Sequence, residues 1–394
     1  MTHSGIMEIN WNSTGTLSTE EYHGIGGTEQ MADSIKSIYN HESLHKVAVD
    51  IQSVYNPFQI DDFLASVIDE TWDDLELKNR IYRISEILGK YLPSDYGTAI
   101  GIIDKVVMNY GTWFTGFCSF FPIFVEIYGQ DEINWDISMA ALERFTPYAS
   151  SEIAVRPFII SHEERMMAQM YIWSKHKNEC VRRLACEGCR PALPWAPALK
   201  SFKKDPAAIL PILSQLKTDP SIHVRKSVAN NLNDISKTHP DLVAKLAKDW
   251  YGKHEYTDWI VKHGCRTLLK KGNPDVLAVF GYKNTASVDV DGFALKTASV
   301  LIGGDITFSF SVSAKEAQKI RLEYGIDYVK SNGKRNRKIF QISEISLKAN
   351  QKKQYAKTHS FADVSTRKHY PGIHSITLIV NGAEKGTLDF KLSI

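Results

Sequence analysis

The chain has 394 residues, of which 43% are hydrophobic and 23% charged, a composition typical of globular proteins and a length that suggests two domains. No apolar stretch is long enough to cross a membrane and no basic-then-apolar leader opens the chain, so we expect a cytoplasmic protein without a membrane partner. The five cysteines are an odd number, which suits reduced thiols better than a disulfide framework.

The first part of the chain predicts a tail followed by a helical region. Residues 1–30 are rich in Gly, Ser, Thr and Asn and lack an apolar period, which indicates a tail without regular structure. From 31 to 282 the apolar residues recur at helical spacing. Capping residues that directly precede a proline mark helix starts, as in Asp205-Pro206, Asp219-Pro220 and Asn273-Pro274. These marks predict helices near 206–217, 220–236, 240–251 and 257–271.

The helical region repeats. The segments that begin at Val181, Val224 and Ile260 align without gaps, at steps of 43 and 36 residues. Helix pairs at this period predict a solenoid of HEAT-like or armadillo-like repeats, in which one helix of each pair lines a concave face. Such a face binds an extended partner. A protein-binding scaffold is one reading, and a nucleic-acid-binding surface is the other.

After residue 282 the period of the apolar residues changes to two. Alternating stretches at 306–312, 320–328, 376–380 and 388–392, with a turn at Asn381-Gly382, predict an antiparallel β-sandwich of immunoglobulin type over 285–394. This part holds 17 Lys+Arg against 10 Asp+Glu, whereas the remainder holds 30 against 35. The basic residues gather in segments that we expect to be loops, 330–338, 348–357 and Arg367-Lys368. Such a basic domain indicates either a polyanionic partner or a surface that favours solubility.

Three acids in the helical region have partners at helical spacing: Glu152 with Arg156, Glu187 with Arg183 and Arg190, and Asp234 with Asn230. The repeat alignment places Glu187 at the position of Asn230, one turn before Asp234. Neighbouring inner helices are therefore expected to aim carboxylates in a similar direction. The alternative is that these are surface ion pairs, which contribute little individually.

Two further features of this region invite a functional interpretation. Trp195 ends a proline-braced loop, 190–195, and such a loop holds an aromatic face against a ligand or packs it between repeats. Cys186 and Cys189 form a C-x-x-C, but no second such pair and no histidine at zinc-finger spacing accompany them. We therefore expect no metal ion and no other cofactor.

Three segments carry a resemblance to a known family. Residues 152–158, 181–195 and 224–234 resemble the AlkC-type DNA alkylation-repair glycosylases of the AlkC/AlkD superfamily, and Ser227-Val-Ala-Asn-Asn-Leu-Asn-Asp234 is the most specific of them. The likeness covers 31–282. Residues 366–374 and 380–382 resemble the immunoglobulin-like domain of some members. The resemblance implies a mainly α solenoid of HEAT-like repeats that cradles duplex DNA, followed by an all-β immunoglobulin-like sandwich.

The resemblance also implies an activity. Members remove cationic N3-alkylated bases, such as 3-methyladenine and 3-methylcytosine, without turning the damaged nucleotide out of the duplex. Glu152, Glu187 and Asp234 fall on the family's active-site acids, and Trp195 falls on its active-site tryptophan. Carboxylates suit this chemistry because they stabilise the positive charge that develops on the sugar, and one of them guides the attacking water. Asp234 is our first choice for the water, with Glu187 as the alternative, and Glu152 contributes charge.

The partner implied by the resemblance is double-stranded DNA that contains alkylated bases, bound by a monomer that associates with the bacterial nucleoid. The candidate DNA-binding residues are Trp195, Arg156, Arg183, Arg190, Arg225, Lys226, Arg266, Lys270 and Arg367. Phosphate contacts of this kind supply affinity but little sequence information. Arg156, Arg183 and Arg190 have a second possible role, to hold the acids in place. A non-catalytic DNA-binding or damage-sensing protein on the same scaffold remains the alternative function.

Overall fold

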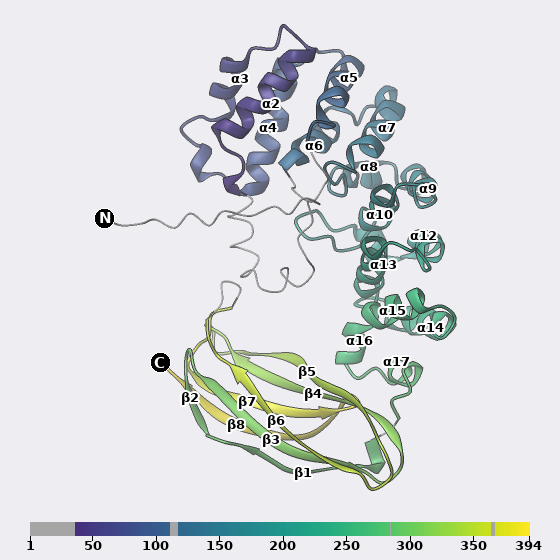
Figure 1. The fold of residues 1–394 in the computed structure, drawn as a ribbon, viewed down its shortest axis with the longest axis vertical. Coiled ribbons are helices and arrows are strands. Elements are labelled where there is room, and N and C mark those ends of the chain that lie inside the picture. The colour runs from purple at the N-terminus through teal and green to yellow at the C-terminus, as the bar shows by residue number, and fades with distance from the viewer. Residues whose placement is uncertain (1–35, 111–116, 284, 364–366) are drawn as a thin grey trace.

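The computed structural model describes residues 36–110, 117–283, 285–363 and 367–394. The predicted tail, 1–30, lies outside these residues. Helices occupy the first part of the described chain and strands the last part (Figure 1). The predicted fold class, an α solenoid followed by a β-sandwich, is confirmed.

The helices stack into a curved array, and the β-region at its end turns back toward the side on which the first helices lie (Figure 1). They are α2 (His41–Val54), α3 (Ile60–Val67), α4 (Leu77–Tyr91), α5 (Tyr96–Val107), α6 (Phe120–Tyr128), α7 (Trp135–Phe145), α8 (Arg156–Ser161), α9 (Glu163–Trp173), α10 (Glu179–Glu187), α11 (Lys200–Lys204), α12 (Leu210–Leu216), α13 (Ile222–Ile235), α14 (Pro240–Trp250), α15 (Glu255–Gly264), α16 (Arg266–Lys270) and α17 (Pro274–Val279). No helix in the described part of the chain has the length and apolar character needed to cross a bilayer.

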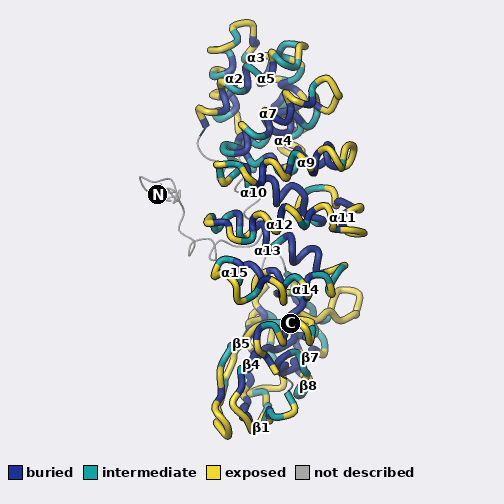
Figure 2. The backbone as a smooth tube through the Cα atoms, turned by 90° about the vertical axis from the view of Figure 1, so that its right-hand side faces the viewer, coloured by how far each residue is buried: buried dark blue, intermediate teal, exposed yellow. Residues whose placement is uncertain are grey.

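The sequence repeat corresponds to one row of this stack. The three aligned segments fall in α10, α13 and α15, which form an inner row, while α9, α12 and α14 form an outer row (Figure 1). Gly264 explains how closely two inner helices approach, because a Cβ there would lie 2.9 Å from Cβ of Leu232 on α13. Much of α10 and α13 is buried in the middle of the stack (Figure 2). The inner row is therefore a firm support for side chains at its surface.

One predicted helix differs from the structure. The region 257–271 forms two helices, because α15 ends at Gly264 and α16 begins at Arg266. Cys265 between them has φ −85° and ψ 4°, which is outside the helical region. Glycine favours a helix end because it lacks the side chain that restricts the backbone.

The strands form two sheets packed over one apolar core. They are β1 (Val288–Leu295), β2 (Ser299–Leu301), β3 (Asp305–Ala314), β4 (Gln318–Val329), β5 (Arg335–Leu347), β6 (Lys352–Ser360), β7 (Gly372–Val380) and β8 (Ala383–Ser393). The orders are β1-β3-β6 and β2-β8-β7-β4-β5, with only the β2–β8 pair parallel among the named strands. Buried residues alternate along β3, as the period of two predicts.

Two of the three basic segments predicted as loops lie partly in strands. Only 330–334, 348–351 and the Arg367-Lys368 pair lie outside strands, and the other basic residues belong to β5 and β6. The prediction was wrong because β5 and β6 are the edges of their sheets, and an exposed edge strand carries charge on residues that a central strand would bury. The positive charge therefore lies along two sheet edges.

The β-sandwich is docked on the last helices. Lys262 of α15 forms an ion pair with Glu344 of β5 at 2.6 Å. The β7–β8 turn meets the turn between α16 and α17, where a Cβ on Gly382 would lie 2.4 Å from Cα of Gly272. Asn381 and Gly382 have φ values of 43° and 77°, which the tight hairpin predicted at Asn-Gly requires. This turn thus both closes a hairpin and fixes one domain against the other.

Candidate active site

The three predicted acids belong to one network in which acidic and basic side chains alternate. Arg183 of α10 donates to Oε2 of Glu152 at 2.5 Å and lies 4.0 Å from Oε1 of Glu187. Arg190, in the loop after α10, donates to Oε1 of Glu187 at 2.5 Å and to Oδ2 of Asp234 on α13 at 2.9 Å. Carboxylates from three separate segments are therefore joined by two arginines on the inner row.

The structure rejects the surface ion-pair reading of these acids. Their side chains are 22%, 7% and 2% exposed for Glu152, Glu187 and Asp234. It also corrects the partner of the first acid. Glu152 lies in the turn before α8 and not on a helix with Arg156, and its carboxylate accepts from Ser150 and Arg183 instead.

The two arginines respond to the acids around them. Burial alone would lower the pKa of Arg190, but the carboxylates of Glu187 and Asp234 outweigh burial and raise it. At Arg183 burial also lowers the pKa, but the carboxylates of Glu152 and Glu187 outweigh it, so the pKa is raised. Both guanidinium groups therefore stay charged in an interior that would otherwise reject them.

Lys237 also belongs to this network of ion pairs, although it was not among the residues predicted from the sequence. Its Nζ donates to Oδ1 of Asp234 at 2.8 Å, and its side chain is 50% exposed. It lies three residues after Asp234, so the spacing in the sequence already indicates this pair, although Lys237 lies beyond the end of α13. Asp234 therefore accepts from Arg190 on one oxygen and from Lys237 on the other, while no described residue donates to Oε2 of Glu187.

Arg156 has a different role from the DNA contact predicted for it. It is fully buried, and its guanidinium donates to the backbone carbonyls of Gly188, Arg190 and Pro197. Burial lowers its pKa to about 10, so it remains charged at neutral pH. A side chain so enclosed cannot reach a phosphate. It braces both ends of the loop that carries Trp195.

Trp195 stands out from this loop. It is 61% exposed, so it does not pack between repeats, and its φ of 62° is rare for a residue with a bulky side chain. Lys78 of α4 donates to its carbonyl at 3.1 Å and ties the loop to an earlier repeat. The loop thus presents an aromatic ring to solvent on a backbone that is held from both sides.

The remaining DNA-binding candidates divide into accessible and occupied groups. Lys226, Arg266 and Lys270 are exposed on α13 and α16, although Arg266 also donates to Asn230 at 3.0 Å. Arg225 is occupied, because it donates to the carbonyls of two residues in the preceding turn, 219 and 220, and stacks 4.1 Å from the Tyr256 ring. In the sandwich, the partly buried Arg367 donates to the Tyr328 hydroxyl at 3.1 Å.

The cysteines near the acids are core residues. Cys186 and Cys189 are fully buried, and the Cys189 thiol donates to the carbonyl of Ala185. Burial raises the pKa of Cys186 to about 12 and that of Cys189 well above its usual value. Within the described ranges, no group of three or more His, Cys, Asp or Glu residues has the arrangement of a metal site.

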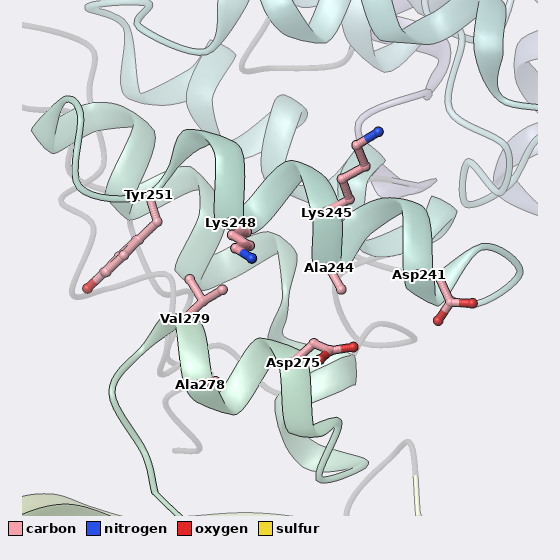
Figure 3. Close-up of a pocket in the computed structure, with 8 residues that line it drawn as sticks. All are labelled: Asp241, Ala244, Lys245, Lys248, Tyr251, Asp275, Ala278 and Val279. Carbon is pink, nitrogen blue, oxygen red and sulfur yellow. The ribbon is translucent and has the colours of Figure 1, made fainter.

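Two hollows differ in their relation to the acids. One, of about 610 Å³, lies between α14 and α17 (Figure 3). Two lysines, two aspartates and a tyrosine line it together with small apolar side chains. The other, of about 450 Å³, lies beside Glu152 and Trp195 and is lined mainly by apolar side chains of α4 and α6. Only the second of these two hollows is continuous with the candidate active site.

Comparison with protein families defines the class of this architecture. Residues 148–268 match the model described as DNA alkylation repair enzyme, and 289–394 match that of the C-terminal Ig-like domain of the uncharacterised protein YhaZ. The first match contains all three acids and Trp195. The fold and the matched site together define a DNA alkylation-repair solenoid with an immunoglobulin-like domain.

Two similar proteins narrow the class to a family. YhaZ from Bacillus subtilis (strain 168) is 46% identical over 92% of this chain and 100% of its own length. The Pseudomonas fluorescens alkylpurine DNA glycosylase AlkC, solved with DNA containing an abasic site analog, is 36% identical with a TM-score of 0.86, over 91% of this chain and 99% of its own. The chain belongs to the AlkC-type family of DNA alkylation-repair glycosylases, as the sequence motifs predicted.

Proposed function

We propose that the protein hydrolyses the N-glycosidic bond of cationic N3-alkylated bases, 3-methyladenine and 3-methylcytosine, in duplex DNA without base flipping. The observation that carries this proposal is the set of buried or half-buried carboxylates, Glu152, Glu187 and Asp234, which Arg183 and Arg190 link together, with the exposed Trp195 lining the same hollow as Glu152. The AlkC relative, which is bound to DNA containing an abasic site analog, supports DNA as the partner.

The chemistry suits carboxylates without a general acid. An N3-alkylated base already bears a positive charge and leaves without protonation. As its bond to the sugar breaks, positive charge moves to the sugar ring, and fixed carboxylates stabilise that charge. The exposed face of Trp195 adds a cation–π contact with the same centre.

The attacking water needs a carboxylate oxygen that is open to it. We assign this role to Asp234, whose Oδ1 becomes available when Lys237 turns toward a phosphate, because Lys237 is half exposed and long enough to leave. Arg190 stays in place and keeps the other oxygen oriented. Glu187, whose Oε2 accepts from no described residue, is the alternative acid for the water.

DNA binding is assigned to exposed lysines on or next to α13 and α16 and to the basic sandwich. Lys226 of α13, Lys237 just after α13 and Lys270 of α16 are exposed, and the edge strands β5 and β6 add positive charge. Each lysine that contacts a phosphate contributes about 0.9 to the slope of log K against log salt. Lys226→Met is therefore expected to lower this slope by about one unit in a filter-binding titration, and an unchanged slope would remove Lys226 from the contact surface.

Base release from DNA treated with N-methyl-N-nitrosourea tests the activity. We expect the native protein to release 3-methyladenine and 3-methylcytosine, and Asp234→Asn and Glu187→Gln each to slow release by about 100-fold or more. Asp219→Asn is the matched control, because Asp219 is equally buried and paired with Arg182 but lies outside the chain of acids. No release by the native protein, with binding retained, would favour a damage-sensing function. Unchanged release by both acid variants would reject the assigned acids.

A further inference from the structure

The hollow beside the acids has two fixed aromatic walls. The Tyr82 hydroxyl donates to Glu126 at 2.8 Å, which holds the Tyr82 ring on α4. On the opposite segment, the carbonyl of Trp195 accepts from Lys78. Both Lys78 and Trp195 line the hollow, and their hydrogen bond fixes the backbone that carries the Trp195 ring.

The rest of the lining divides into an apolar surface and a polar margin. Leu77, Ile81, Ile123 and Ile153 supply the apolar surface. Glu152 belongs to the margin, where its Oε2 accepts from Ser150 and Arg183 and its Oε1 has no partner among the described residues. A flat apolar ligand with a hydrogen-bond donor at one edge would satisfy both parts.

We propose that this hollow receives the released base after the glycosidic bond is cleaved. The inference rests on the proposed function, since the bases expected there, 3-methyladenine and 3-methylcytosine, are planar heterocycles with an exocyclic amino group. The faces of such a base pack between Tyr82 and the isoleucines, and its amino group donates to Oε1 of Glu152. A volume of about 450 Å³ lies within the range of small-molecule sites.

The position of the hollow gives the base a route out of the DNA. Glu152 and Trp195 belong both to the acid site and to the hollow, so a base that leaves the sugar passes directly from one to the other. A base that remained in the gap in the duplex would stay next to the sugar cation and re-form the bond. Removal to a separate site therefore favours attack by water.

Binding of free 3-methyladenine to the full chain tests the inference, with tryptophan fluorescence as the readout. We expect saturable quenching with a Kd of about 0.1–1 mM, ordinary for a ligand of this size. Adenine, which lacks the methyl group, should bind about fourfold more weakly, the contribution of one buried methyl group. Added 3-methyladenine should also slow base release from alkylated DNA over the same concentration range.

Variants that fill the hollow supply the control. Ile81→Phe and Ile81→Trp should weaken binding in that order, while Ala278→Trp, which fills the groove between α14 and α17, should leave it unchanged. Thermal unfolding of each variant excludes loss of fold as the cause. No saturable binding at several millimolar, or binding that Ile81→Trp leaves intact, would overturn the proposal. Base release by the native protein in the same preparation separates that result from a failure of the proposed function.

Discussion

Replacing Arg190 by methionine should show how strongly the acids depend on their arginines. The substitution removes a buried cation that makes contacts of 2.5 Å with Glu187 and 2.9 Å with Asp234, whose side chains are 7% and 2% exposed. Breaking a buried ion pair on one side costs about 3–5 kcal/mol, because the remaining charge is left without compensation. In a protein of this size we expect the melting temperature to fall by about 5 °C.

The pH dependence of the stability lost in Arg190→Met shows whether uncompensated carboxylates cause the loss. Without Arg190, two buried carboxylates lose the positive charge that compensates them, which makes proton uptake by the folded variant more favourable than in the native protein. The folded variant then binds more protons than the folded native protein as the pH falls, and its deficit in stability relative to the native protein should shrink between pH 7 and pH 5. Urea unfolding followed by circular dichroism at both values measures this difference.

A matched control separates burial from charge. Arg144 also forms an ion pair, with Asp104 at 2.5 Å, but their side chains are 48% and 28% exposed. Arg144→Met should therefore cost no more than about 1 kcal/mol at either pH. A loss below about 1 kcal/mol for Arg190→Met, or a loss of constant size from pH 7 to pH 5, would refute the view that Arg190 neutralises the acids.

Three further predictions follow from other parts of the chain. Burial holds the pKa of His359 at about 4, so the unfolded chain takes up a proton between pH 6.5 and 4 that the folded chain refuses. Stability should fall by up to about 3 kcal/mol over this window, and His359→Gln should flatten the fall seen in urea titrations. Gly382→Ala should cost about 2–3 kcal/mol and weaken DNA binding, since its Cβ meets backbone across the domain interface, whereas Gly333→Ala, with a similar φ but open space, should cost about 1 kcal/mol and leave binding unchanged. Equal effects would show that φ strain alone matters. Arg156→Met should lose about 3 kcal/mol and slow base release at temperatures where it stays folded, because three carbonyls lose their donor and Trp195 loses its support. Normal release by that folded variant would show that the brace is only structural.

The sequence predicts the architecture well because each level of it has its own period. Helical spacing, a repeat near 40 residues and a switch to a period of two are local patterns, and the structure reproduces them in α10, α13 and α15 and in β3. The basic segments failed as loops because the edge position of β5 and β6 depends on pairing between distant strands. No local pattern contains that information.

The members of the site were predicted, but only the contacts within one segment of the chain were predicted correctly. Spacing along one helix suggested that Glu152 pairs with Arg156, yet its partner Arg183 lies 31 residues away on α10. Arg156 instead reaches carbonyls 32 to 41 residues away. Both contacts cross from one repeat to the next, and the spacing rule applies only within a helix. Helical spacing predicted the pairing of Glu187 with Arg183 and Arg190, which the structure confirms, whereas the links from these arginines to Glu152 and Asp234 became visible only in the fold.

The local sequence predicted a proline-braced loop around Trp195, but it did not show which residues hold that loop in place. A bulky residue at φ 62° is unfavourable by itself, and an exposed tryptophan adds little burial to offset that cost. The conformation persists because Arg156 donates to backbone carbonyls of the loop on both sides of Trp195, and Lys78 donates to the carbonyl of Trp195 itself. Two cations that never need to touch DNA are thus committed to hold one ring in an unfavourable position. Backbone strain that the surrounding structure maintains is expected where a side chain must meet a ligand, and Trp195 lines, together with Glu152, the hollow that we assign to the released base.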